Sequence, residues 1–493
     1  MAKSETGYTA VSFLLEDSPR TLFPLTTNQI LVQRGSDELL GFGRKLAGGS
    51  GSFLPQKRVY ANKDELHLRR TVKLDAVAEI YLYDLVYRNR GRFRKPNSKT
   101  RNHFGYRFAN GRPVPPSTSY ADFRNSVFEH HIMSEEFISC DISDYFNHIY
   151  HHDLQAWFAA LEPTKAEDVE SFGKYLREIN AGRSLDCLPQ GLYPAKMIGN
   201  DFLRFVEESS TIRAPRIARF MDDIVLLGDK ENELKADFGE LQRLLGLKGL
   251  AINSKKTRFG GTPITGEVDD QIGDLKKGLL QLRRRMVAQG YEGDEISSEY
   301  NEPLQQNQID LVLELLASPS LGEDDAELIM VVMRDHVALI EDHLASFAEG
   351  YPHLAKNFFS LCRAANDKES VARIVLDVAR QGTHIGEYQL FWFGSMLEDY
   401  LLETSQASDL VHALYSHPSA TEISKAKILE INDRRYGLAE MREVYLREGR
   451  SDWLAWASAV GCLSMKKQAR NYLLGYFSNG SPMNKLIAEI LQK

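Results

Sequence analysis

The segment that decides the fold runs from Arg216 to Gly228 and reads RIARFMDDIVLLG. Apolar and β-branched residues flank Met221, Asp222 and Asp223 on both sides, which is typical of two short strands joined by a tight turn. Two adjacent carboxylates at the tip of a hairpin repel each other, and a divalent cation offsets this repulsion directly. The alternative is a solvated turn, in which aspartate is also a favoured residue.

A second acidic segment lies upstream, where Phe137 to Ile142 reads FISCDI and predicts a strand with Asp141 at its end. If this strand lies beside the hairpin, Asp141 joins Asp222 and Asp223 in one carboxylate cluster. The backbone carbonyl of Ile142 adds a further hard oxygen ligand for a metal ion. Such a cluster suits two Mg²⁺ ions about 4 Å apart, with Mn²⁺ as a substitute, and it supports nucleotidyl transfer. By itself, Asp141 favours an ordinary strand-to-helix turn over a metal site.

The surrounding chain predicts an α+β fold followed by helices. From about Phe137 to Phe259, strand, helix, hairpin, helix and strand follow one another, which favours a split β-α-β sheet backed by helices. Beyond about residue 275, amphipathic helices interrupted by proline and glycine predict an all-α domain of HEAT-like repeats, with a non-repeating bundle as the alternative. The expected domains are residues 1–136, 137–270 and 271–493.

Length and composition indicate a multi-domain globular protein, with 493 residues, 43% hydrophobic and 26% charged. Four scattered cysteines, the lack of a signal-peptide pattern and the lack of a long apolar run predict a soluble, cytoplasmic protein without membrane contact. The net charge of -8 is unusual for a nucleic-acid enzyme. However, Tyr87 to Phe108 contains eight lysines and arginines among aromatics and no acidic residue, which suits a groove for single-stranded DNA or a solvated loop.

Two further motifs are weak when taken alone. LPQG places Gln190 and Gly191 at the entry to a predicted helix, and GLAINSKKTRFG places Lys256 after a short predicted strand. Glycine lets the backbone approach a nucleotide closely. A lysine beside a triphosphate neutralises charge or donates a proton to the leaving pyrophosphate.

Together, DISDYF, LPQG, FMDD and GLAINSKKT resemble the motifs of reverse transcriptases, in the order of that family, over roughly residues 69–259. The resemblance implies fingers within residues 1–136 and a palm within residues 137–270. It also implies that Asp141 and Asp222 are metal ligands and that Asp223 is the third catalytic carboxylate. Further residues are implied to bind the nucleotide: Phe146 as an aromatic gate beneath the sugar, Gln190 in the pocket, Lys256 facing the triphosphate, and Arg69, Arg70 and Lys73 as finger cations.

The layout is most similar to the bacterial abortive-infection (Abi) reverse transcriptases, closest to the P2-prophage Abi type, with AbiK as a longer relative. This resemblance implies antiphage defence by a DNA polymerase that uses dNTPs, needs no template and starts synthesis on the protein itself. It also implies a covalently attached single-stranded DNA product and a homo-oligomer. Tyr8, in a polar N-terminal segment expected to be mobile, and Tyr60 are the priming candidates.

Two rival functions remain open on the sequence alone. One is a templated RNA-directed DNA polymerase of retron or group II intron type, which an assay with and without an RNA template distinguishes. The other is a catalytically silent scaffold protein whose helical surface acts instead. The intact aspartates argue against the scaffold, because clustered carboxylates without a ligand contribute only repulsion.

Overall fold

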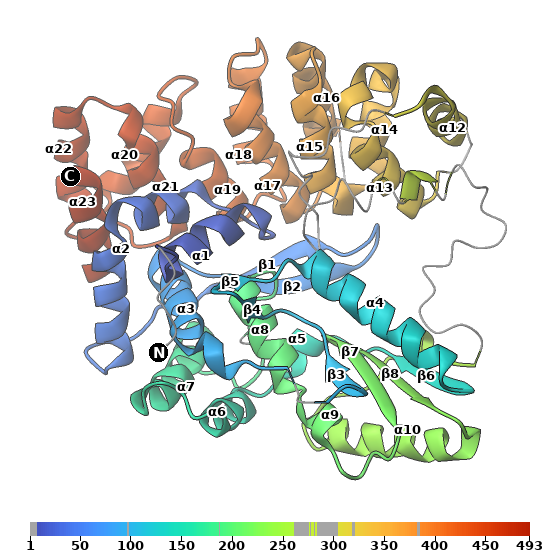
Figure 1. The fold of residues 1–493 in the computed structure, drawn as a ribbon. Coiled ribbons are helices and arrows are strands. Elements are labelled where there is room, and N and C mark those ends of the chain that lie inside the picture. Colours follow the sequence, from blue (N-terminus) through green and yellow to red (C-terminus); the bar gives the residue numbers. More distant parts are fainter. Residues whose placement is uncertain are drawn as a thin grey trace. The chain divides into compact units, whose positions relative to one another are not determined.

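The chain divides into two compact units in the computed structural model (Figure 1). The structure describes residues 7–95, 98–186, 188–260, 276, 278–280, 282, 304–317, 321–381 and 385–493. Unit 1 comprises Met1–Pro19, Leu40–Lys57 and Thr71–Gln271, and unit 2 comprises Arg20–Leu39, Arg58–Arg70 and Ile272–Lys493.

A five-stranded mixed sheet forms the centre of unit 1, in the order β3-β7-β8-β6-β9. Its first pair, β3 and β7, is parallel, and the remaining pairs are antiparallel. The predicted hairpin is present as β7 and β8, which turn at Met221 and Asp222. The strands are β3 (Arg101–His103), β6 (Glu136–Cys140), β7 (Arg216–Phe220), β8 (Asp223–Gly228) and β9 (Arg258–Phe259).

Helices cover both faces of this sheet (Figure 1). On one face, α4 (Pro116–Ile132) packs against the hairpin, because the rings of Tyr120 and Phe123 contact Phe220. On the other face, α10 (Glu231–Gly246) packs against β6 and β8. Unit 1 also contains α1 (Ala10–Asp17), α3 (Ala76–Asn89), α5 (Tyr145–His148), α6 (His151–Ala160), α7 (Glu167–Ile179), α8 (Tyr193–Phe202), α9 (Phe205–Glu208), and the short strands β4 (Phe108–Ala109) and β5 (Arg112–Pro113).

Several helices of unit 1 follow the apolar periodicity of the sequence. The predicted helices around Leu154, after Pro194 and around Leu241 are present as α6, α8 and α10. Helix α8 begins one residue before Pro194, since proline has no N–H to leave unsatisfied and fits the first helical turn. The buried helix α3 begins at a capping carboxylate, because Asp75 accepts hydrogen bonds from two N–H groups of its first turn.

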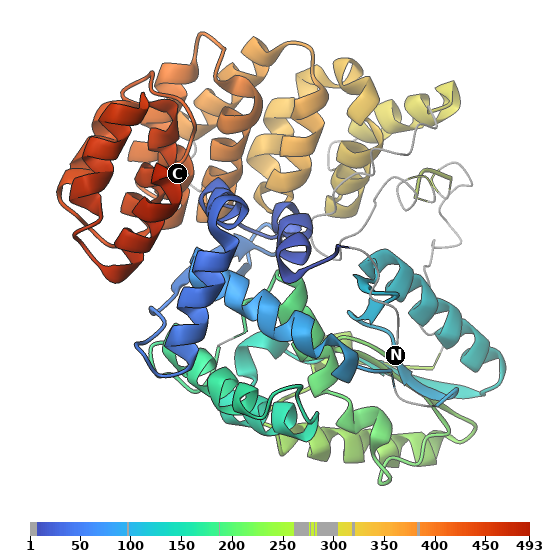
Figure 2. The same ribbon diagram turned by 60° about the vertical axis from the view of Figure 1, so that its left-hand side comes forward.

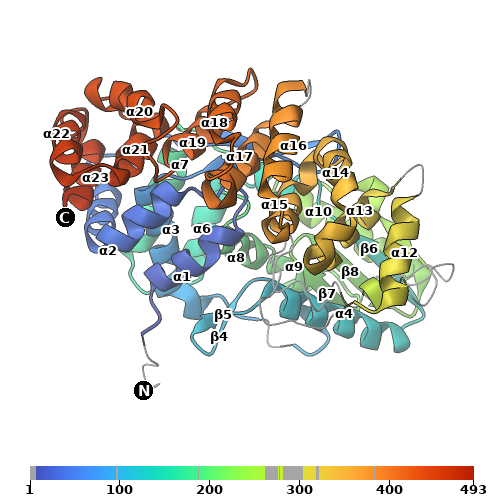
Figure 3. The ribbon, with the colours of Figure 1, turned by 90° about the horizontal axis from the view of Figure 1, so that it is seen from above.

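Unit 2 is dominated by helices that pack in two rows. In the first row, each helix contacts the next in the order α13, α15, α17, α19, α21 and α23 (Figure 3). In the second row, α16 contacts both α14 and α18, and α20 contacts α22. Figure 2 shows the C-terminal helices (red) side by side. The helices are α12 (Gln306–Leu316), α13 (Glu323–Val332), α14 (Leu344–Gly350), α15 (Ala355–Ala364), α16 (Lys368–Gln381), α17 (Glu387–Met396), α18 (Ala407–Ser416), α19 (Glu422–Leu429), α20 (Leu438–Arg447), α21 (Trp453–Gly461), α22 (Lys467–Phe477) and α23 (Pro482–Gln492).

Unit 2 also includes N-terminal residues, which no local pattern in the chain predicted there. Helix α2 (Thr26–Ala47) begins at the buried carboxylate of Glu430, which accepts hydrogen bonds from the backbone N–H and hydroxyl of Thr27, both at 2.7 Å. A side chain at Gly35 would collide with Ile490, so the close approach of α2 to α23 requires glycine. Strands β1 (Lys57–Asn62) and β2 (Leu68–Lys73) form a separate two-stranded sheet.

Within the described part of the chain, no helix has both the length and the apolar character that crossing a membrane requires.

Candidate active site

The pairing of β6 with β8 brings the three predicted aspartates together. The ladder between these strands ends with Cys140 opposite Ile224. The next residues at that end are Asp141 and Asp223, so the antiparallel register places them side by side. Asp222 lies in the adjoining turn, where the charges of Asp223 and Asp141 both act on it.

Asp141 is held by a short segment that crosses the end of β6. Ile142 forms an isolated antiparallel bridge with Ile252, and the N–H of Asn253 donates to the carbonyl of Asp141 at 2.7 Å. The amide of Asn253 also donates to the Asp141 carboxylate at 3.4 Å. The carbonyl of Ile142 is not part of this bridge and faces the other edge of the strand. Sequence reasoning missed Asn253, whose only signal was its place after the predicted strand.

Lys256 comes from the same segment and lies at the carboxylate cluster. Its ammonium is 3.3 Å from the Asp141 carboxylate, although the lysine side chain is 56% exposed. Asp141 and Asp223 open onto a cavity of about 340 Å³, on which Lys255 and Arg258 add positive charge that sequence reasoning did not single out. The other lining residues are Tyr120, Ser139, Cys140, Ile224 and Val225.

The electrostatics of the cluster show the cost of placing carboxylates together. Burial, reinforced by the negative charges of Asp223 and Asp141, raises the pKa of Asp222 from 3.8 to about 7. The positive charge of Lys256 acts in the opposite direction but does not cancel this effect. A cation that reaches Asp222 directly would offset the repulsion, but near pH 7 it would compete with a proton for this carboxyl group.

The donors at this site match the preference of Mg²⁺ and Mn²⁺ for hard oxygen ligands. Within the described ranges, no group of three or more His, Cys, Asp or Glu side chains is arranged to hold a metal ion by itself. A metal ion at this site would therefore need further oxygen ligands besides the aspartate side chains. Such an incomplete set fits a catalytic metal, because oxygens of the substrate complete the coordination.

Phe146 and Gln190 both lie against helix α8 or its entry loop. The ring of Phe146 is buried and packs on Gly199, where an added Cβ would come within 3.1 Å of two ring carbons. The carbonyl of Gln190 accepts a hydrogen bond from the hydroxyl of Thr71 at 2.7 Å. Asp17 accepts one from the first N–H of α8 at 2.9 Å, so both sides of the LPQG loop are fixed.

The three candidate finger cations are not equivalent. Lys73 is buried, and its ammonium lies 3.4 Å from the equally buried carboxylate of Glu79. Glu79 therefore neutralises the positive charge of Lys73 in this structure. Arg69 and Arg70 belong to unit 2.

The two priming candidates differ in how firmly they are held. The hydroxyl of Tyr8 donates to Glu16 at 3.1 Å, and its carbonyl accepts a hydrogen bond from the hydroxyl of Tyr87 at 2.6 Å. Burial and the charge of Glu16 raise the pKa of the Tyr8 phenol above its usual range. Priming on the Tyr8 phenol would therefore require its hydrogen bond to Glu16 to open. Tyr60, on β1 in unit 2, is 43% exposed.

Much of the basic stretch is committed to contacts within the protein. Arg88 forms a bidentate ion pair with Asp168, at 2.7 and 3.0 Å. Arg107 lies 3.4 Å from Asp122, and Arg101 donates to a backbone carbonyl. These charges help to build unit 1, so the stretch presents less free positive charge than its sequence indicates.

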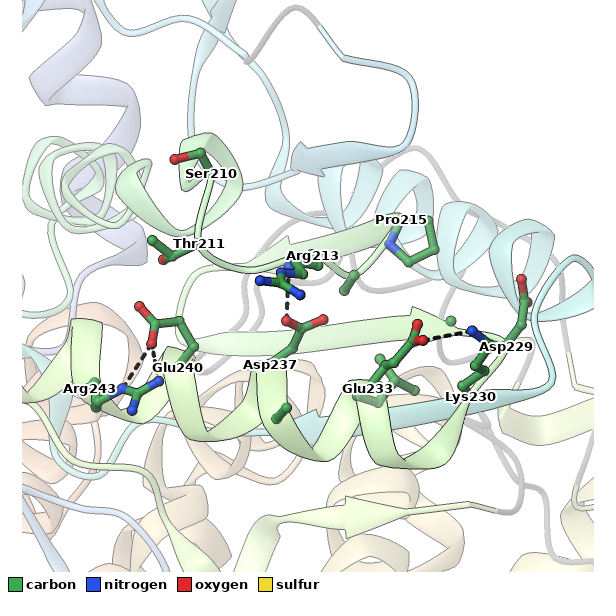
Figure 4. A pocket seen from close by; sticks show the side chains of 14 residues that line it. Ser210, Thr211, Arg213, Pro215, Asp229, Lys230, Glu233, Asp237, Glu240 and Arg243 are labelled. Carbon is green, nitrogen blue, oxygen red and sulfur yellow. Dashed lines mark hydrogen bonds and ion pairs between the residues drawn. The ribbon is translucent and has the colours of Figure 1, made fainter.

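A larger groove of about 820 Å³ lies at the opposite end of the hairpin, between residues 210–215 and α10 (Figure 4). Most of its charged side chains form ion pairs or hydrogen bonds with other residues that line the groove. Lys230 and Glu233 form an ion pair at 2.7 Å, and the N–H of Arg213 donates to Asp237 at 2.9 Å. We therefore place the candidate chemistry at the aspartates.

Comparison with known proteins identifies the class of domain that carries this site. Residues 92–268 match the reverse transcriptase (RNA-dependent DNA polymerase) family. The chain therefore contains a reverse transcriptase domain, which supports a polymerase-type nucleotidyltransferase. No curated protein matches the chain.

Solved telomerase structures are similar to the chain at low identity. Telomerase from Candida albicans, in complex with a TWJ fragment of telomeric RNA, is 11% identical over 61% of this chain and 49% of that chain, with a TM-score of 0.24. Apo telomerase from Candida tropicalis is 9% identical over 93% of this chain and 73% of that chain, with a TM-score of 0.32. The chain thus spans about half the length of the first of these.

The raised pKa of Asp222 predicts that metal binding depends on pH. Below pH 7 a metal ion must displace a proton from this carboxyl group, so each lower pH unit should raise the half-saturating Mg²⁺ concentration about tenfold. A titration of the unfolding temperature with Mg²⁺ at pH 6 and pH 8 measures this change. Equal half-saturating concentrations at both pH values would contradict it.

The stability of Asp222→Asn, measured without metal and compared with that of wild type, tests the raised pKa of Asp222 separately. Because the pKa of Asp222 is higher in the folded than in the unfolded chain, its contribution to stability is present below pH 3.8 and is lost as the pH rises towards 7. The asparagine side chain carries no charge at any pH, so this variant should unfold at a higher temperature than wild type at pH 8.

Proposed function

We propose that the chain is a DNA polymerase of the reverse transcriptase type, in which Asp141, Asp222 and Asp223 are the catalytic carboxylates. The observation that carries this proposal is the β6–β8 register, which joins the three aspartates within the matched domain. Two Mg²⁺ ions, when bound, would activate the attacking hydroxyl and neutralise charge on the triphosphate of a dNTP.

The remaining site residues receive roles that fit their positions. Lys256, already at the carboxylates, would face the triphosphate and donate a proton to the pyrophosphate as it leaves. The carbonyl of Ile142 would act as a metal ligand beside Asp141 and Asp222. Phe146 would lie beneath the sugar, and Gln190 would line the nucleotide pocket. Arg70 and Lys73 would be finger cations that bind the triphosphate, and Lys73 could do so only after its ion pair with Glu79 opens.

The biological role is proposed from the resemblance to Abi polymerases. We propose cytoplasmic antiphage defence through untemplated, protein-primed DNA synthesis, with a covalent single-stranded product and a homo-oligomeric enzyme. Residues 1–136, 137–270 and 271–493 would form fingers, palm and helical repeats. The two-row packing of the helices in unit 2 supports the HEAT-like assignment of that domain.

The first test removes the carboxylates one at a time. Asp141→Asn and Asp222→Asn should each lower dNTP incorporation at least roughly a hundredfold, because each removes a charge that would hold metal and organise the triphosphate. Incorporation of labelled dNTPs by purified protein in Mg²⁺ measures the loss. Circular dichroism should remain unchanged.

Asp229→Asn is the matched control, since this exposed aspartate follows β8 at the opposite end of the hairpin. It should retain wild-type incorporation. Omitting and adding an RNA template separates untemplated from templated synthesis. Substantial incorporation by the Asp141 and Asp222 double variant would overturn the assignment.

The second test asks whether Phe146 excludes ribonucleotides. A flat ring beneath the sugar leaves no room for a 2′-hydroxyl, so Phe146→Ala should raise the ratio of rNTP to dNTP incorporation about tenfold or more. Gly199→Ala should also change this ratio, because its new Cβ presses on the ring. Phe158→Leu, a core change on α6, controls for lost packing. Retained activity with an unchanged ratio for Phe146→Ala would leave Phe146 as a packing residue.

The third test examines protein priming. Wild type incubated with radioactive dNTP should acquire SDS-resistant label, and Tyr8→Phe or Tyr60→Phe should remove it if that phenol is the primer. Tyr472→Phe controls for an exposed tyrosine elsewhere, since Tyr472 is 56% exposed. If both candidate variants label like wild type, neither phenol is the primer. If wild type never labels, protein priming itself is wrong.

A further inference from the structure

Arg219 is a fully buried charge three residues before Asp222. It lies on β7 and faces the side of the sheet opposite to Phe220, whose ring meets α4. Its guanidinium forms an ion pair with Glu207 of α9, and both side chains are 0% exposed. A second contact of this pair, from Nη2 of the arginine to Oε2 of the glutamate, measures 3.4 Å.

The same guanidinium holds the turn that carries the aspartates. Nη1 of Arg219 donates to the carbonyl of Met221 at 2.7 Å, and Nη2 donates to the carbonyl of Asn200 at 2.8 Å. Met221 has a φ of 54°, in the left-handed region that a residue with a Cβ rarely adopts. Such a turn persists only where its surroundings hold it, and the hydrogen bond from Arg219 is a contact of this kind.

The partners of Arg219 are fixed in turn. The side-chain oxygen of Asn200 lies 3.3 Å from Nη1 of Arg219, and its amide nitrogen lies 3.1 Å from Nδ1 of the buried His103. An added Cβ at Gly105 would come within 2.2 Å of the Asn200 side chain, so no larger residue fits there without movement. Arg219 therefore links β3, α8, α9 and the catalytic turn in one buried network.

We propose that Arg219, neutralised by Glu207, is a positioning residue that sets the place of Asp222 relative to Asp141 and Asp223. The inference rests on the proposed polymerase function, because it concerns the same metal site. A merely structural role predicts loss of stability alone. A positioning role predicts weaker Mg²⁺ binding even in a variant that folds.

The decisive variant replaces both buried charges, as Arg219→Met with Glu207→Met. Exchanging a buried ion pair for apolar side chains of similar volume is often tolerated, but here it also removes the donor to Met221. The half-saturating Mg²⁺ concentration, measured from the rise in unfolding temperature, should increase at least tenfold. Arg219→Lys retains a charge for Glu207 but lacks the planar fork, so it should weaken Mg²⁺ binding in the same direction.

Arg442→Met is the matched control, because Arg442 is also fully buried and also donates to backbone carbonyls, but within unit 2. It should lower stability and leave the Mg²⁺ dependence unchanged. Wild-type Mg²⁺ dependence in the folded double variant, or in Arg219→Lys if the double variant does not fold, would overturn the positioning role. If wild type itself shows no Mg²⁺ response that Asp222→Asn removes, the proposed function fails instead.

Discussion

Repulsion among three carboxylates is the constraint on which the rest of unit 1 depends. The register of β6 and β8 places Asp141 beside Asp223, and the turn adds Asp222, whose pKa is raised by burial and further by the charges of its two neighbours. A protein that placed these groups together without support would relieve the strain by moving the turn. The surrounding structure therefore has two tasks, which are to supply positive charge and to keep the turn in place.

The two faces of the sheet divide these tasks between them. Tyr120, Asp141 and Asp223 line the same cavity, which lies on the face covered by α4. Lys256 brings its positive charge to Asp141. Arg219 acts from the opposite face, where a fully buried ion pair is isolated from water and its hydrogen bonds cannot be exchanged for solvent. Positive charge thus lies at the open cavity, and the contacts that hold the turn lie on the buried face of the sheet.

Local pattern predicted the hairpin and several helices of unit 1 because their signals are contained in a few neighbouring residues. The apolar and β-branched residues on both sides of FMDD and the apolar stripe of α10 each predict an element by themselves, and the structure has both. The pairing of Arg219 with Glu207 joins residues 12 positions apart through tertiary packing, so no local period signals it. The same reason explains why the sequence predicted Lys73 as a finger cation and did not indicate that Glu79 neutralises it. It also explains why the packing of Thr27 on Glu430, 403 residues away, was not foreseen.

The segment from Asn253 to Lys256 is placed beside Asp141 by one isolated β-bridge, between Ile142 and Ile252. Pairing of Ile142 with Ile252 fixes the chain that follows, and Asn253 then hydrogen-bonds both the backbone and the carboxylate of Asp141. Three residues later, the backbone of Lys256 follows this held segment, and its ammonium lies 3.3 Å from that carboxylate. The lysine is well placed because its backbone is held, while its half-exposed side chain can still turn from the carboxylate towards a phosphate. A rigid backbone with a movable charge fits the role proposed for Lys256, in which it neutralises a triphosphate and then releases the pyrophosphate.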